Sequence, residues 1–157
     1  MPAANHSYLF SLHSVLKSSH YEEQLVALFQ QEWSDFTHES LNMANTPEAI
    51  VVERNNEVVA GIAFTRYPAP DDPNVQALWL NAVYVKSKYR GLGLARRLVL
   101  AAIQEAYKIN ETALYAYTNV GGMYETLSWE KVAKEEENEV GHSVYRYKLD
   151  AMPCSVP

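Results

Sequence analysis

The sequence predicts a mixed α/β domain, and three observations lead to this fold class. The chain has 157 residues, of which 48% are hydrophobic, which is enough to form one core and too many for a disordered protein. Two long stretches, 21–36 and 94–109, repeat apolar residues at helical spacing. Short apolar runs bounded by turn residues, typical of strands, lie between and after them. We therefore expect one domain over residues 1–157, with 150–157 as a short tail.

The N-terminal half is expected to contain a helix and a β-hairpin. After an apolar opening at 8–12, the helix 21–36 carries apolar side chains on one face and Glu and Gln residues on the other. Two apolar runs, 49–53 and 58–64, flank Arg-Asn-Asn-Glu, which indicates a hairpin because Asn tolerates positive φ in tight turns. The segment 67–74, Tyr-Pro-Ala-Pro-Asp-Asp-Pro-Asn, is expected to be a proline-rich loop.

The C-terminal half alternates strands with helices. A strand over 75–85 leads directly into a glycine-containing turn, which is followed by the helix 94–109. The remaining expected elements are a strand over 112–118, a short helix over 122–127, and two strands near 129–135 and 141–149. The predicted order is therefore α, β, β, β, α, β, α, β, β.

Charge and cysteine content exclude several classes of function. A net charge of −6 and a pI near 5.3 disfavour nucleic acid and anionic membranes, since both require a basic face. The only cysteine is Cys154, so no intramolecular disulfide can form, and a reducing compartment is the default. The segment 8–12 lacks a basic leader, and no apolar run reaches the length of a membrane span. We therefore expect a cytoplasmic protein.

No metal site is expected. His6, His13 and His20 are each separated by two helical turns, which is too far for one ion, and no Cys or carboxylate completes a ligand set.

The most informative segment is 84–97, in which a strand-like run breaks into a glycine turn and then begins a helix. Glycines let the main chain approach a ligand closely, and the first N–H groups of a helix have no partners of their own. No Ser, Thr, Asp or Asn stands just before the helix, as expected where a ligand oxygen caps it. The Gly-Lys-Ser/Thr of a P-loop is missing, and Arg96 stands where a dinucleotide fingerprint needs glycine or alanine. The segment therefore predicts a different kind of phosphate site.

The amino-acid sequence of this turn resembles that of a known family. Residues 90–95, Arg-Gly-Leu-Gly-Leu-Ala, resemble the acetyl-CoA pyrophosphate loop of the GNAT acyltransferase superfamily. Residues 123–129, Met-Tyr-Glu-Thr-Leu-Ser-Trp, resemble the family's Leu-Tyr-x-x-Leu-Gly-Phe signature, with Ser128 in place of Gly and Trp129 in place of Phe. The order of elements from the second strand onward is also similar. The resemblance implies a mainly antiparallel central sheet with helices on both faces and an acetyl-CoA cleft.

The resemblance also implies which residues contact acetyl-CoA. In the family, the fourth strand parts from the fifth at a bulge, and the pantetheine arm lies in the gap. The matching residues here are Val83, Tyr84 and Val85, whose main-chain groups would pair with pantetheine, and one of their N–H groups would polarise the thioester carbonyl. An ordinary core strand explains the alternating apolar residues of this segment equally well. N–H groups of the glycine turn would hold the diphosphate, helped by arginines. The expected contacts are Val83, Tyr84, Val85, Arg90, Gly91, Leu92, Gly93, Leu94, Ala95, Arg96 and Asn119.

The resemblance assigns catalysis to Tyr124. A phenol with a pKa of about 10 can return a proton to a thiolate whose thiol titrates near about 8.5, provided that it lies beside the sulfur. The alternative is one more packed tyrosine among the eleven in the chain. No general base is apparent, because Asn81 and Tyr84 could hold a relay water but neither is a good base. Glu32 and Trp33 would suit a cationic amine, and the simpler interpretation of each is a helix-face or core residue.

The expected activity is transfer of an acetyl group from acetyl-CoA to a primary amine of a small molecule. Attack is expected to be direct, within a ternary complex, because the only thiol lies in the tail. A protein or peptide N-acetyltransferase, a non-catalytic acyl-CoA-binding module and an atypical nucleotide-binding domain remain alternatives. A homodimer could form through 144–149, which is expected to be an open sheet edge. No motif identifies the amine acceptor.

Overall fold

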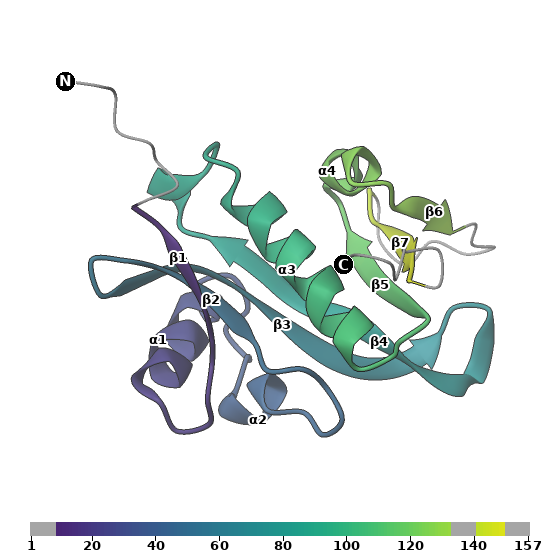
Figure 1. Ribbon diagram of the computed structural model, residues 1–157, viewed down its shortest axis with the longest axis horizontal. Helices are drawn as coiled ribbons and strands as arrows, with labels where there is room; N and C mark the ends of the chain where they lie inside the picture. Colours follow the sequence, from purple (N-terminus) through teal and green to yellow (C-terminus); the bar gives the residue numbers. More distant parts are fainter. Residues whose placement is uncertain (1–8, 133–140, 150–157) are drawn as a thin grey trace.

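The computed structural model describes residues 9–132 and 141–149, which form one seven-stranded sheet in the order β1-β2-β3-β4-β5-β7-β6 (Figure 1). All neighbouring strands are antiparallel except β4 and β5, which are parallel. The expected mixed α/β fold with a mainly antiparallel sheet is confirmed. The strands are β1 (Ser11–Ser14), β2 (Ile50–Arg54), β3 (Glu57–Ala69), β4 (Asp72–Val85), β5 (Ala113–Thr118), β6 (Glu130–Val132) and β7 (Ser143–Lys148). The helices are α1 (His20–Phe29), α2 (His38–Leu41), α3 (Leu94–Lys108) and α4 (Gly121–Thr126), with a 3₁₀ turn at Ser87–Tyr89.

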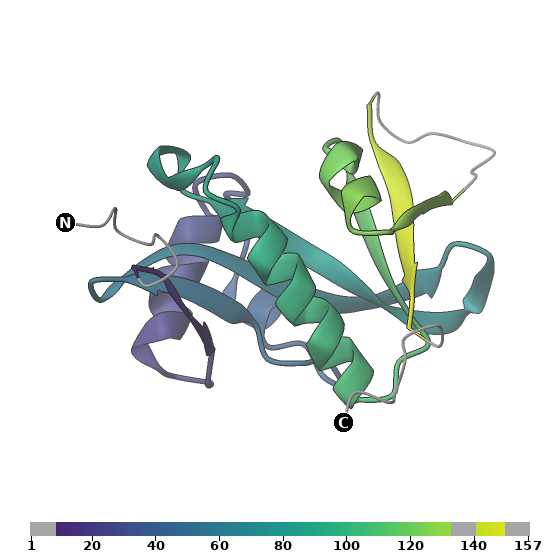
Figure 2. The same ribbon diagram turned by 45° about the horizontal axis from the view of Figure 1, so that its top comes forward.

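Helices cover both faces of the sheet (Figures 1 and 2). α3 presents one apolar stripe to β2, β3 and β4, where Leu98 belongs to the same buried cluster as Phe64. α1 covers the opposite face, where Leu25 and Phe29 belong to a second cluster together with Ala63 of β3. Each large apolar side chain buried in this way stabilises the fold by about 1.5–3 kcal/mol. No helix among the described residues is long and apolar enough to cross a membrane.

The segment 67–74, expected to be a proline-rich loop, is instead the end of a long β-hairpin. β3 continues to Ala69 and β4 begins at Asp72, so that only Pro70 and Asp71 lie between them. Beyond residue 63 β3 has no partner in β2, and before Leu78 β4 has no partner in β5. Each strand of this two-stranded ribbon therefore has one open side, where a proline does not break a ladder of hydrogen bonds. The loop prediction was wrong because it ignored this exception.

The first helix is shorter than expected. α1 ends at Phe29, and residues 30–36 form turns, closed by a 2.8 Å hydrogen bond from Gln30 Nε2 to the Phe36 carbonyl. Phe36 still packs against Phe29, with ring centroids 4.9 Å apart, so the apolar spacing is satisfied without a helix. The chain also contains β1, which pairs with β2, and the short helix α2, neither of which the sequence predicted. Both are too short to show a clear period.

The strand β7 lies inside the sheet, between β5 and β6. The expected open edge at 144–149 was therefore wrong, because residues 144–146 already pair with β6. The strand expected at 129–135 is described only as far as Val132. Its remainder, His6, the tail 150–157 and Cys154 lie outside the described residues.

A buried carboxylate joins the parts of the chain around α1 and α2. Glu22 is 7% exposed and accepts hydrogen bonds from the Ser18 N–H at 2.6 Å and from His38 Nδ1 at 2.8 Å. These hydrogen bonds, the one from Ser18 first, hold the pKa of Glu22 below its usual value. Because His38 begins α2, Glu22 joins the start of α1 to the far end of the connection that contains Glu32 and Trp33.

Replacing Glu22 with glutamine is expected to lower the free energy of unfolding by about 1–2 kcal/mol at pH 7, because charge-assisted hydrogen bonds become neutral ones. A lowered pKa stabilises the fold above the unfolded-state value and loses this effect as pH falls through the folded-state value. The difference between the two proteins should therefore shrink below about pH 4. Urea denaturation at several pH values measures it. Glu23→Gln, on the exposed side of the same helix, is the control, and equal losses in both variants would contradict this role.

Candidate active site

The strands β4 and β5 separate soon after they meet. They pair only at Leu78 with Leu114 and at Trp79 with Tyr115. On the other side of β4, the register with β3 shifts between Ala63 and Phe64, which leaves Asn81 as an extra residue, a β-bulge. Beyond this bulge the second half of β4 diverges from β5 and α4 (Figure 2).

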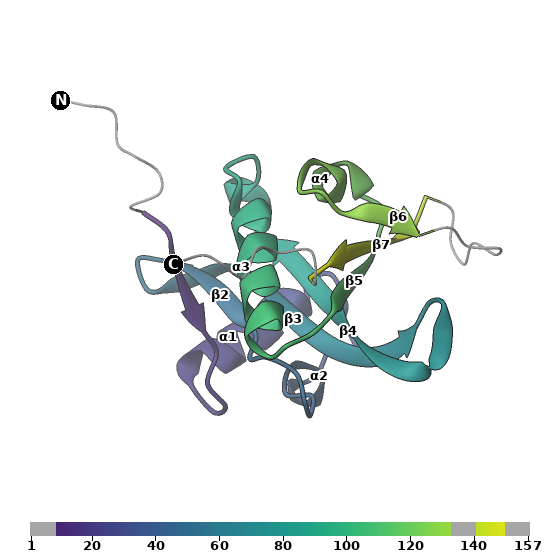
Figure 3. The same ribbon diagram turned by 45° about the vertical axis from the view of Figure 1, so that its right-hand side comes forward.

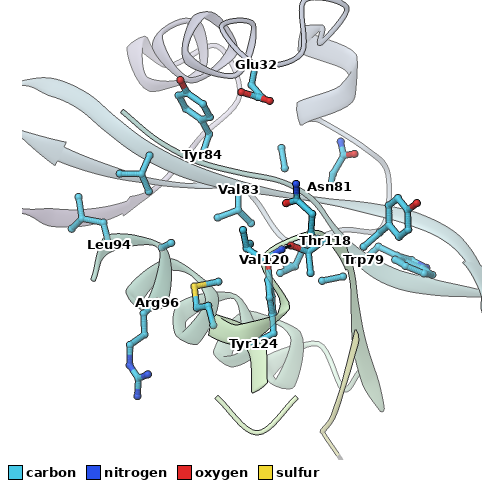
Figure 4. Close-up of a pocket in the computed structure, with 18 of the residues that line it drawn as sticks. Glu32, Trp79, Asn81, Val83, Tyr84, Leu94, Arg96, Thr118, Val120 and Tyr124 are labelled. Carbon is cyan, nitrogen blue, oxygen red and sulfur yellow. Dashed lines mark hydrogen bonds between the residues drawn. The ribbon is translucent and has the colours of Figure 1, made fainter. Parts of the chain in front are cut away.

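The bulge changes which residues of β4 face each side of the sheet. Before it, Leu80 packs in the core beneath α3; after it, Val83 and Val85 do so. Tyr84 consequently packs on the α1 side. Figure 4 shows Glu32 and Tyr84 on one side of β4, and Val83, Arg96 and Tyr124 on the other. Residues from both faces of the sheet therefore lie beside the gap between β4 and β5.

A cleft of about 1250 Å³ surrounds this gap. It is lined by the second half of β4, the glycine turn, the end of β5, the start of α4 and the turn after α1. Of the residues that the sequence predicted, only Leu92 does not line it; its side chain is 42% exposed. The predicted residues that the fold brings together here are Val83, Tyr84, Val85, Arg90, Gly91, Gly93, Leu94, Ala95, Arg96, Asn119, Tyr124, Glu32, Trp33 and Asn81.

The glycine turn presents a row of free N–H groups to the cleft. Gly91 and Gly93 have φ angles of 81° and 80°, which turn the chain into α3 without a side-chain cap. The first helical hydrogen bond runs from the Arg97 N–H to the Gly93 carbonyl. Among the described residues, no acceptor is found for the N–H groups of 91–96. Together with the positive end of the α3 dipole, these groups form a site for an anion such as a diphosphate.

The arginines near this turn have different positions. Arg90 donates from Nε to the Val85 carbonyl at 2.8 Å, and its guanidinium lies 5.3 Å from the centroid of the Tyr84 ring. It therefore connects the glycine turn to the end of β4. Arg96 is exposed in the first turn of α3 and projects away from β4 (Figure 4).

The main chain of β4 offers hydrogen-bonding groups to the gap. The Lys86 N–H donates to the Val59 carbonyl of β3. Because successive peptide groups of an antiparallel ladder alternate in direction, those of Val83 and Val85 point away from β3, whereas those of Tyr84 point toward it. The position of Arg90 on the Val85 carbonyl agrees with this direction. Val83 therefore has both its N–H and its carbonyl directed into the gap.

Tyr124 lies deep in the cleft. It is 3% exposed, its ring packs edge-on against Trp129 at 4.9 Å, and its side chain points from α4 toward Val83 (Figure 4). Its hydroxyl has no hydrogen-bond partner among the described residues. Burial raises the pKa of Tyr124 far above that of a free phenol, so the unperturbed pKa assumed from the sequence does not hold. The phenol therefore remains protonated, as a donor, throughout the physiological pH range.

The residues expected near an amine acceptor lie on the α1 side of the gap. The Trp33 ring packs against Tyr84 at 6.3 Å, and Glu32 precedes it in the turn after α1. Asn81, at the bulge, makes a long hydrogen bond of 3.4 Å from Nδ2 to the Ser40 carbonyl. Asn119 is exposed just beyond the end of β5. Among the described residues, no group of three or more His, Cys, Asp or Glu side chains could hold a metal ion.

Sequence reasoning missed several aromatic residues of the cleft, among them Tyr67, Trp79, Tyr117 and His142. Tyr67 was assigned to a loop, and the face of Trp79 depends on a bulge that no sequence pattern showed. The sequence did contain one signal for this surface. Tyr115 and Tyr117 are alternate residues of a strand, so their side chains are expected on the same face of the sheet.

Residues 9–127 match the sequence model of the acetyltransferase (GNAT) family. This chain belongs to the GNAT acetyltransferase family. The family membership that the resemblance predicted is thus confirmed.

Solved GNAT structures share this fold at low sequence identity. YhbS from Escherichia coli, in complex with CoA, has a TM-score of 0.69 and 16% identity over 89% of this chain and 81% of that chain. An aminoglycoside 6′-acetyltransferase type Ii has a TM-score of 0.70 and 17% identity over 91% of this chain and 99% of that chain. Naa50 from Arabidopsis thaliana, with the bisubstrate analogue CoA-Ac-MVNAL, has a TM-score of 0.62 and 14% identity over 89% and 99%. At these identities the likeness shows the fold alone. No curated protein is similar enough in sequence to count as a relative.

Proposed function

We propose that this protein transfers an acetyl group from acetyl-CoA to the primary amine of a small molecule by direct attack, without an acyl-enzyme. One observation carries the proposal: the gap between β4 and β5 opens into the same cleft as the free N–H groups of 91–96 and the hydroxyl-bearing face of Tyr124. An elongated ligand with a diphosphate at one end and a reactive group further along fits this arrangement.

The residues present fit CoA. The N–H groups of 91–96 would hold its diphosphate, and the exposed Arg96 would add a charge-assisted contact. The carbonyl of Val83 and the N–H of Val85 would pair with the amides of the pantetheine arm, as an added strand would. Asn119, at the end of β5, would contact the same arm from the other side of the gap. When bound, acetyl-CoA supplies the activated acetyl group.

The chain's own groups would then divide the chemistry. The Val83 N–H donates toward the carbonyl oxygen that becomes negative as the amine nitrogen bonds to the acetyl carbon. Tyr124 gives its proton to sulfur as the carbon–sulfur bond breaks. Its raised pKa does not prevent this, because the desolvation that raises it also raises the basicity of a thiolate leaving in the same place. Asn81 uses Nδ2 on Ser40, so its Oδ1 can orient a water that accepts the proton lost by the amine.

The lack of a cysteine among the described residues supports direct attack. The described residues include no cysteine, and Cys154 is the only one in the chain. We expect initial rates, measured by thiol release over a grid of acetyl-CoA and amine concentrations, to give intersecting rather than parallel reciprocal plots. Cys154→Ser should retain full activity. Parallel plots, or loss of activity in the variant, would contradict direct attack.

A panel of acceptors tests the proposed function as a whole. It should contain polyamines, aminoglycosides, amino acids, simple amines and short peptides, because the solved GNAT structures include enzymes for both small molecules and peptides. Release of thiol with a small amine supports the proposal. Turnover of peptides alone would favour an N-terminal acetyltransferase, and tight CoA binding without any turnover would favour a binding module.

A further inference from the structure

The part of the cleft on the α1 side is walled by aromatic rings. The residues that line the cleft here are Tyr67 of β3, Trp79 of β4, Tyr117 of β5 and His142, which directly precedes β7. Tyr67 is 62% exposed and Tyr117 is 38% exposed. Large aromatic side chains on the wall of a cleft offer a surface on which another ring can pack.

These rings are held in place by contacts with one another. Trp79 stacks on Tyr115 at 5.1 Å and meets Tyr67 edge-on at 5.9 Å, and its Nε1 donates to the Tyr67 carbonyl at 3.2 Å. Tyr117 stacks on His142 at 5.0 Å. The wall spans neighbouring strands, and these contacts fix the position of Trp79, so a ring that packs on it requires little rearrangement of that side chain.

The charges of the cleft are divided between its two ends. Among the described residues that line it, Arg90 and Arg96 lie at the glycine turn, and Glu32 is the one carboxylate. Glu32 lies on the α1 side, opposite Arg96 with respect to β4 (Figure 4). An ammonium group is therefore favoured on the acceptor side. On this acceptor side, no described Lys or Arg lines the cleft to pair with a carboxylate of the acceptor. A polyamine would find one described carboxylate, that of Glu32, for its several positive charges.

We propose, on the basis of the proposed function, that the acceptor is an arylalkylamine: one aromatic ring, a short alkyl chain and one primary amine, without a carboxylate. The ring packs on the wall formed by Tyr67, Trp79 and Tyr117. The amine reaches the gap beside Val83, and Glu32 favours entry of the ammonium form.

Thiol release with a matched set of amines tests this assignment. The set contains 2-phenylethylamine, hexylamine, spermidine and phenylalanine, which differ in the ring, the number of charges and the carboxylate. We expect kcat/KM for 2-phenylethylamine to exceed that of the other three by about tenfold or more. Equal values for 2-phenylethylamine and hexylamine would overturn the inference while leaving acetyl transfer intact. Failure of all four amines while another small amine of the wider panel is acetylated would also overturn the inference, and only failure of the whole panel would refute the proposed function.

Tyr67→Ser provides a second test within the protein. The side chain is largely exposed, so its removal should not affect folding, while kcat/KM for 2-phenylethylamine falls about threefold to tenfold through KM. The values for hexylamine should fall less, because an alkyl chain gains less from contact with an aromatic ring than another ring does. Leu100→Ser, which removes a 44% exposed apolar side chain from α3 outside the cleft, is the matched control. An equal loss for both amines in Tyr67→Ser would show that this tyrosine does not recognise a ring.

Discussion

Replacing Tyr124 with phenylalanine is expected to lower kcat by about 100-fold or more, with the affinity for acetyl-CoA changed by no more than about twofold. The ring would keep its packing against Trp129, since only the hydroxyl is lost. That hydroxyl points into the gap, has no partner among the described residues and stays protonated because burial raises its pKa. Steady-state thiol release gives kcat, and calorimetric titration gives the affinity.

Tyr145→Phe is the matched control for this prediction. Tyr145 stacks on Tyr124 at 6.1 Å, but its hydroxyl donates to Glu125 at 3.0 Å and it does not line the cleft. Its loss should leave kcat within about threefold. If Tyr124→Phe retained full turnover, the tyrosine would be a packing residue and the proton donor would have to be sought elsewhere.

Replacing Gly93 with valine is expected to weaken CoA binding by about 100-fold or more, the largest effect expected on affinity. A side chain there would meet no atom within 4 Å, so it would not clash with the protein. The φ of 80° at Gly93 is nevertheless strained for a β-branched residue, at about 1–2 kcal/mol, and relief of this strain would turn the N–H groups of the turn away from one another. A side chain would also stand where the diphosphate approaches the main chain. Calorimetric titration with CoA measures the change.

Gly141→Val separates strain from ligand binding. Gly141 has a φ of 83° and the same open surroundings, but it lies two residues before β7 and outside the glycine turn. Both variants should lose similar stability in thermal denaturation, and only Gly93→Val should lose CoA affinity. Arg96→Ala should weaken binding by about tenfold at most, because main-chain groups carry most of the site. An affinity that depended more on Arg96 than on Gly93 would contradict that account.

Sequence reasoning succeeded where one local pattern decides the structure. The period of α3 and the glycines before it fix a helix start at Leu94, and that start carries the free N–H groups to which the phosphate site is assigned as a prediction. The alternation of 112–118 likewise predicted β5. The positions around Tyr124 and Val83 came from a family resemblance, and the fold places them in one cleft, although their chemical roles remain predictions.

Features that depend on tertiary neighbours were not predictable. Prolines at 68–73 fit a strand only because the hairpin extends past β2 and β5. The bulge at Asn81 is defined by its register with β3, which no single strand shows. Phe36 packs on Phe29 without a helix, so its spacing misled the prediction of α1. The aromatic wall combines side chains of separate strands, and only the assembled sheet makes it visible.

Only two residue pairs join the β1–β4 half of the sheet to β5 by strand pairing (Figure 3), and the remaining contacts between the halves are side-chain packing, as in the stacking of Trp79 on Tyr115. A ligand bound between β4 and β5 would contact both halves of the sheet and would bind only the folded protein. By mass action, the free energy of unfolding would then increase with the concentration of that ligand. Resistance of the protein to heat and to proteases would rise with the concentration of free coenzyme, so its lifetime in a cell would reflect metabolic state.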